Sequence, residues 1–215
     1  MAVADGMIVY SPAADLKKMK EDKPIRRTPT FEQFQQIIES IRSQEFNGHG
    51  ADESADFVEF VGLAGLGQAE ASALTWPDID WQREQIITFR HKTKSGFAIP
   101  LYPQLRPLLE KRHAQRSPED DRVFKIKDAK RAIAAACKRL GFPAFSHRSF
   151  RRMFIVRAIE RGVDVKVIAE WQGHKDGGTL ILRTYSHVNP VHSKRMAALM
   201  TTEQPENVIT MKGVA

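Results

Sequence analysis

Residues 146–185 hold a group of side chains suited to phosphate chemistry. They read S-H-R-S-F-R-R-M-F, then E-W-Q-G-H-K, then L-R-T-Y-S-H-V, and so combine arginines, a histidine and Tyr185. The planar fork of an arginine binds two phosphate oxygens and stays charged. A tyrosine, with an ordinary pKa of about 10, becomes a nucleophile when a base or a positive field activates it. The stretch therefore predicts a phosphate site with a phenol beside it.

Each of these residues also has a structural interpretation. Tyr185 could pack in the core beside its aliphatic neighbours, and His174 follows a glycine that ends a helix, where an exposed polar residue is ordinary. Arg148 and Arg152 could form a solvated basic face. The order of the surrounding motifs, given below, favours the functional interpretation.

The elements around these residues predict a mainly α-helical domain with a small antiparallel β-sheet, an α+β fold. Thr30 and Gln33 form a capping box at the start of the first helix. Helices are expected over residues 30–41, after the loop N-G-H-G with apolar residues at 57–63, and over 103–113, 129–140, 149–160, 165–171, 179–185 and 192–200; strands are expected over 78–89 and 97–101. The turn between the strands carries Lys92 and Lys94.

The composition indicates which kind of binding partner and which cellular compartment to expect. The chain has 215 residues, a net charge of +7 and a single cysteine, Cys137. A basic chain favours a polyanionic partner, because each phosphate that it neutralises releases counterions. One cysteine forms no internal disulfide, which favours a reducing compartment and a cytoplasmic location. Long apolar runs and signal-peptide patterns are missing from the sequence, so we expect neither membrane insertion nor secretion.

Five motifs stand in one order: G-L-G-Q-A-E, K-T-K-S-G-F-A-I-P-L, R-S-F-R, W-Q-G-H-K and T-Y-S-H-V. In this order the chain resembles the catalytic domain of the tyrosine recombinases, the phage integrase family. The resemblance implies cleavage and rejoining of double-stranded DNA through a 3′-phosphotyrosine, without metal, ATP or another cofactor, and assembly of several copies on DNA. It further implies a division into a linker or tail of an upstream DNA-binding domain (1–23), a catalytic domain (24–200) and a flexible tail (201–215).

The resemblance also assigns roles. Tyr185 takes the position of the nucleophile, Arg151 that of the second catalytic arginine, and His174 that of a histidine that hydrogen-bonds the phosphate. Lys92 takes the position of the lysine that protonates the leaving 5′-oxygen, with Lys94 as a competing candidate. Arg148 stands where the family has a histidine; as a residue of the site it could bind the phosphate, but an arginine is a poor proton-transfer group at neutral pH.

Further residues receive weaker assignments from the same resemblance. His147 and Glu70 are expected as accessory residues of the site. Arg152, Lys94 and Lys175 are expected to contact DNA. The spacing between the histidine and the tyrosine motifs is two residues longer than the family pattern, through D-G-G.

One residue departs from the family pattern. The family has G-L-R-x-x-E where this chain has G-L-G-Q-A-E, so Gly67 occupies the place of the first catalytic arginine. The sequence between Arg42 and Arg83 contains no arginine, so a shifted register does not restore it. Losing such a donor costs about 10²- to 10³-fold in rate, and more for an arginine finger. We therefore expect slow cleavage unless Arg148, or an arginine from another region, substitutes.

Three functions remain open from the sequence. The first is a recombinase of reduced activity, and the second is a DNA-binding protein that keeps the recombinase fold without catalysis. A topoisomerase-like enzyme that relaxes DNA without partner subunits is the third. The segment V-I-T-M near the end of the chain is a candidate for docking on a neighbouring copy.

Overall fold

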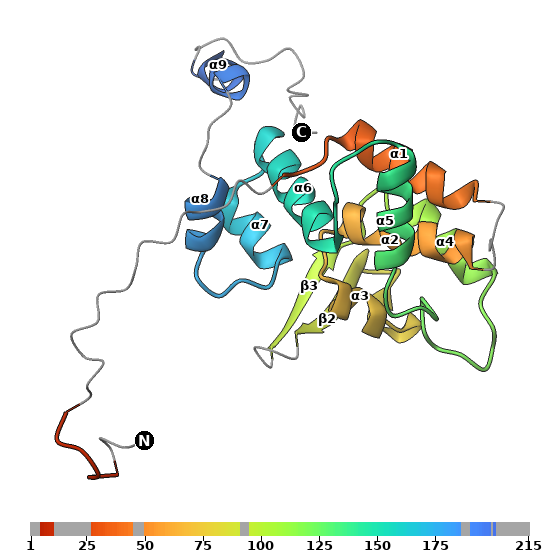
Figure 1. Ribbon diagram of the computed structural model, residues 1–215, viewed down its shortest axis with the longest axis horizontal. Coiled ribbons are helices and arrows are strands. Elements are labelled where there is room, and N and C mark those ends of the chain that lie inside the picture. Colours follow the sequence, from red (N-terminus) through yellow and green to blue (C-terminus); the bar gives the residue numbers. More distant parts are fainter. Residues whose placement is uncertain are drawn as a thin grey trace, which may run out of the picture.

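The computed structural model describes residues 5–10, 27–44, 50–90, 95–185, 190–198 and 200, with all their side chains except those of residues 183–185, 190–192 and 195. The described part is mostly helical with one small antiparallel sheet (Figure 1), which confirms the expected fold class. In chain order the elements are α1 (Phe31–Arg42), α2 (Ala51–Ala64), α3 (Gln68–Ala73), the 3₁₀ turn η1 (Trp76–Asp78), β1 (Ile79–Asp80), β2 (Gln85–Arg90), β3 (Ser95–Pro100), α4 (Arg106–Ala114), α5 (Lys130–Arg139), α6 (His147–Glu160), α7 (Val165–Trp171), α8 (Thr179–Tyr185) and α9 (Pro190–Ala198).

Most helices lie close to the ranges that local sequence signals predicted. The capping box of Thr30 and Gln33 is formed at the start of α1, and α7 and α8 have the expected bounds. Three starts differ: α4 begins at Arg106, after a turn that follows Pro103, α6 begins two residues before Ser149, and α9 takes in Pro190. The short helix α3 was not predicted.

The expected single strand over residues 78–89 is wrong. It is two strands, β1 and β2, joined by a tight turn. The carboxylate of Asp80 accepts hydrogen bonds from the backbone N–H groups of Gln82 and Arg83, and Glu84 has a φ of 52°. The resulting sheet has the order β1-β2-β3 and is antiparallel throughout.

Two apolar clusters form the interior, and α6 contributes to both. Phe150 and Met153 of α6 belong to the larger cluster, which includes residues of α1, α2, α4, α5 and the sheet. Ile155 and Ala158, one turn further, pack with apolar residues of α7 and α8 in the smaller cluster. In Figure 1, α6 accordingly lies between α7 and α8 on one side and the bundle of α1, α2 and α5 on the other. The single cysteine, Cys137, is buried in the larger cluster.

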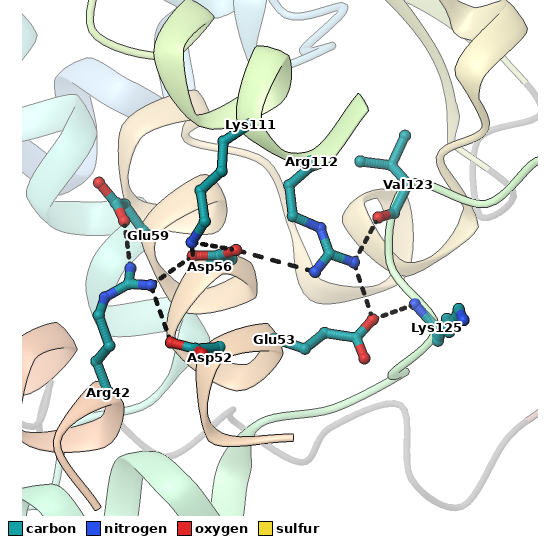
Figure 2. Close-up of polar contacts among 9 residues, drawn as sticks. All are labelled: Arg42, Asp52, Glu53, Asp56, Glu59, Lys111, Arg112, Val123 and Lys125. Carbon is teal, nitrogen blue, oxygen red and sulfur yellow. Dashed lines mark hydrogen bonds and ion pairs between the residues drawn. The ribbon is translucent and has the colours of Figure 1, made fainter. Parts of the chain in front are cut away.

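A buried carboxylate ties α2 to α1 and α4 (Figure 2). The side chain of Asp56 is only 1% exposed, and its Oδ1 lies 2.8 Å from Nη1 of Arg42 and 3.1 Å from Nζ of Lys111. Next to it, Arg112 donates to Glu53 at 3.1 Å and to the carbonyl oxygen of Val123 at 3.0 Å. Since buried carboxylates are unfavourable without partners, this network fixes how the helices pack.

Among the described helices, none combines the length and the apolar character that crossing a bilayer requires.

Candidate active site

The turn that ends α7 places His174. Gly173 has a φ of 61°, and its N–H donates to the carbonyl oxygen of Glu170 while the N–H of His174 donates to that of Ala169. This pair of bonds is a Schellman motif, which requires a left-handed residue after the helix. Phe97 of β3 packs on the bare Cα of Gly173, where an added Cβ would come within 2.7 Å of its ring. The glycine therefore sets the direction of the chain at His174 and allows Phe97 of β3 to pack closely against this turn.

Helix α6 brings Arg151 to the same turn. Ser146 caps the helix, and Phe150 and Met153 turn inward, so Arg151 lies on a neighbouring face of α6. Its Nη2 donates to the carbonyl oxygen of Gln172 at 2.9 Å. The predicted second arginine and the predicted histidine are thus brought together at the end of α7.

A second arginine, not predicted from the sequence, reaches this turn from the sheet. Arg90 is the last residue of β2, and its Nη2 donates to the carbonyl oxygen of Gln172 at 2.5 Å. Its Nη1 donates to the carbonyl oxygen of Gly173 at 3.3 Å, and its Nε to Oε1 of Glu70 at 3.0 Å. The Arg90 side chain is 16% exposed and lies over the ring of Phe97, 5.5 Å from its centroid.

The side chain of Glu70 lies against Gly67. Gly67 precedes α3 as its N-cap residue, and a Cβ added there would lie 2.2 Å from Oε2 of Glu70. The other oxygen of the same carboxylate binds Arg90. Glu70 therefore links the segment around Gly67 to the arginine of β2.

The imidazole of His174 sits in a positive field. Burial lowers its pKa from 6.5, and the charges of Arg151 and Arg90 lower it further, against a smaller opposite effect of Asp176. His174 is therefore neutral at physiological pH and able to donate one hydrogen bond and accept another. The common influence of the two arginines on one ring agrees with their shared contact at Gln172.

The remaining predicted residues lie in different places. His147 is buried, its ring 5.8 Å from that of Phe57 in an edge-on arrangement, and burial lowers its pKa. Arg148 and Lys175 are exposed. Arg152 does not turn toward α7: its Nη2 donates to the carbonyl oxygen of Arg27, ahead of α1, at 3.0 Å.

Three predicted residues fall outside what the structure describes. Lys92 and Lys94 belong to residues 91–94, and the side chain of Tyr185 is among those not described, although its backbone forms the last residue of α8. The segment V-I-T-M lies outside the described residues as well.

The alternation of buried and exposed residues along β2 is a sequence signal for Arg90, a residue that the five motifs do not include. In β2 the side chains of Ile86 and Thr88 are buried, whereas Ile87 and Phe89 are exposed. Successive residues of a strand point to opposite faces, so Arg90 belongs to the inward face. A charged residue in such a position requires a partner.

Comparison with known proteins agrees with this geometry. The Phage integrase family model matches residues 28–192. Among solved structures, the Tn1549 transposon integrase in complex with circular intermediate DNA is 16% identical, with a TM-score of 0.67 over 91% of this chain and 73% of that one. A lambda integrase dimer bound to a COC′ core site is 18% identical, with a TM-score of 0.65 over 83% and 68%. XerA recombinase is 16% identical, with a TM-score of 0.63 over 89% and 69%.

None of the curated protein sequences matches the chain. The family model nevertheless spans most of its length, and the solved structures share its arrangement of helices around a small sheet. The chain therefore belongs to the phage integrase family and has the fold of the tyrosine recombinase catalytic domain.

Proposed function

We propose that this domain cleaves and rejoins strands of double-stranded DNA, with Tyr185 as the nucleophile. The phenol loses its proton to solvent water, its oxygen bonds to phosphorus, and the bond from phosphorus to the 5′-oxygen breaks, leaving a 3′-phosphotyrosine. Lys92 protonates the leaving 5′-oxygen, and rejoining reverses these steps. Arg151 and His174 hold the phosphate, whose charge grows in the transition state.

The meeting of Arg151 with the turn that carries His174 is the observation that carries this proposal. A cation and a neutral imidazole at the end of one helix give a fixed set of donors for phosphate oxygens. The basic charge of the chain favours DNA as the polyanion. Arg152, Lys94 and Lys175 are proposed to contact the DNA backbone further from the reacting phosphate.

The other tyrosines are poor candidates for the nucleophile. The chain has three tyrosines. Tyr102 is packed between Phe154 and Trp171, its hydroxyl is buried, and burial raises its pKa. Tyr10 is exposed and lies in the short described segment 5–10, ahead of the helical domain.

Covalent trapping tests the proposal. The substrate is a pool of nicked duplexes with random sequence around the nick, so that cleavage releases a short 5′-hydroxyl fragment and leaves the protein attached. The unmodified chain should form a denaturant-resistant adduct, and Tyr185→Phe should form none. Tyr102→Phe removes a hydroxyl of the same kind from the interior and should leave the adduct in place. An equal yield from Tyr185→Phe and the unmodified chain would reject Tyr185 as the nucleophile.

One observation favours a second candidate, a DNA-binding protein without catalysis. The Glu70 carboxylate lies beside Gly67, in the place where the family pattern has an arginine. If catalysis has been lost, the unmodified chain should bind duplex DNA with the same affinity as Tyr185→Phe and form no adduct. Gel-shift titrations of both proteins at one salt concentration, beside the trapping assay, separate the two candidates.

A further inference from the structure

We propose that Arg90 supplies the second guanidinium of the phosphate site, in place of the arginine that Gly67 does not provide. This inference rests on the proposed function, because it names a further residue of the same site. Arg90 would contact an oxygen of the reacting phosphate together with Arg151.

The shared anchor of the two arginines is the first support. Nη2 of Arg90 and Nη2 of Arg151 lie 2.5 Å and 2.9 Å from one atom, the carbonyl oxygen of Gln172. The two nitrogens therefore cannot be farther apart than the sum of these distances. A single phosphate group, with its several oxygens, can reach both guanidinium groups from this position.

The link to Gly67 is the second support. The carboxylate of Glu70 lies against the Cα of Gly67 with one oxygen and holds Nε of Arg90 with the other. Arg90 therefore lies one side chain away from the position that the family pattern gives to its first arginine. The guanidinium of Arg90, on β2, thus lies next to the region that the side chain of an arginine at position 67 would reach.

Arg90 has donors left for a ligand. Each terminal nitrogen of a guanidinium carries two hydrogens, and the contacts with Gln172 and Gly173 use one on each. Arg90 and Arg151 together bring two positive charges, and Glu70 brings one negative charge. The cluster is thus positive overall, as binding of a phosphodiester requires.

A structural role for Arg90 is the competing explanation. Its bonds to Gln172 and Gly173 join β2 to the last carbonyl groups of α7, and a cation at a helix C-terminus is stabilising in itself. The two explanations differ in one respect. Only a phosphate-binding role can be taken over by an arginine at position 67, because that residue lies on another segment and does not rebuild the same bridge.

Rescue of Arg90→Gln by Gly67→Arg is the first experiment. In the trapping assay with the nicked pool, Arg90→Gln should slow adduct formation by about 10²- to 10³-fold. Adding Gly67→Arg should recover at least about tenfold of this loss, limited by how accurately the new side chain is placed. Arg106→Gln is the matched control, since Arg106 also pairs with a glutamate and lies over an aromatic ring. It should react at the normal rate.

Binding of inorganic phosphate, followed through the His174 resonances, is the second experiment and does not require cleavage. Arg90→Gln should weaken phosphate binding by about 10- to 100-fold, because a charge-assisted hydrogen bond is lost. Without phosphate, the pKa of His174 should rise in this variant, since one of the charges that lower it is removed. Arg90→Lys keeps the charge but loses the fork, and should bind phosphate with intermediate affinity.

The outcomes separate this inference from the proposed function. If Arg90→Gln keeps normal adduct formation and phosphate affinity while Tyr185→Phe forms no adduct, the inference is overturned and the function stands. If the unmodified chain forms no adduct with the pool, the function fails, and the phosphate titration alone decides the role of Arg90. If Arg90→Gln unfolds by circular dichroism, Arg90→Lys decides: unchanged phosphate affinity in that folded variant, or no recovery by Gly67→Arg, assigns Arg90 a structural role.

Discussion

The carboxylate of Glu70 lies where a side chain of Gly67 would begin. One of its oxygens is 2.2 Å from the position of a Cβ on Gly67, too close for two atoms that are not bonded. The Glu70 carboxylate can therefore hold this position only because residue 67 has no side chain.

Gly67→Ala is expected to displace Glu70. The obstacle is the end of a flexible side chain, so we expect a loss of unfolding free energy of about 1 kcal/mol, the lower end for overpacking. Urea unfolding measures this loss. In a Glu70→Ala background the obstacle is gone, and the double-mutant cycle should show that most of the loss disappears. Additive effects of the two substitutions would contradict the contact.

Asp56→Ala is expected to destabilise the helical bundle strongly. The substitution leaves Arg42 and Lys111 without their buried partner, and breaking a buried pair costs about 3–5 kcal/mol. Asp52 is the matched control, because its side chain is 79% exposed and also contacts Arg42, at 3.5 Å. Asp52→Ala should cost about 1 kcal/mol or less. Chemical denaturation of both variants gives the comparison, and equal losses would contradict the proposed importance of the buried carboxylate.

Stability is expected to rise with pH on the acid side of neutrality. Burial lowers the pKa values of His147 and His174 from 6.5 in the folded chain. Between the lowered values and 6.5 the unfolded chain binds more protons than the folded chain, so stability increases with pH in this window and is complete above it. Urea unfolding from about pH 5 to about pH 8 tests this. His147→Gln should reduce the slope, and an unchanged slope would exclude His147 as a cause.

Gly173→Ala is expected to cost more than Gly177→Ala. Both glycines have a φ of 61°, so each substitution carries the backbone cost of about 1–2 kcal/mol. An added Cβ on Gly177 meets nothing within 4 Å, whereas one on Gly173 meets the ring of Phe97 at 2.7 Å. Overpacking adds about 1–3 kcal/mol at Gly173. The difference in stability loss between the two variants, measured by thermal unfolding, gives the cost of the clash with Phe97. Equal losses would show that Phe97 does not pack against Gly173.

Elements with local signals were predictable from the sequence. The capping box at Thr30 and Gly173, just past the end of α7, each act within a few residues of the chain. The strand over residues 78–89 failed because its break is made by Asp80, whose side chain caps the N–H groups of a turn. Residues 82–85 at this turn are all polar, and a short polar stretch by itself does not distinguish a turn from the exposed part of one strand.

The residues of the candidate site likewise fall into those that a local motif predicted and those that it did not. The motif placed Arg151 and His174, and the structure brings them to one turn of α7. The motif did not point to Arg90, because the contacts that define its role come from Glu70 and from the end of α7, far away in the sequence. Its inward position in β2 indicates that a partner is needed but does not say which one.

Two cations fixed against a single carbonyl oxygen repel each other, and the folded chain carries this repulsion for as long as nothing negative lies between them. Under the proposed function a DNA phosphate at that point would offset this repulsion, so the domain should unfold at a higher temperature with DNA bound than without it. The proposed phosphate site would therefore lower the stability of the domain when no anion is bound.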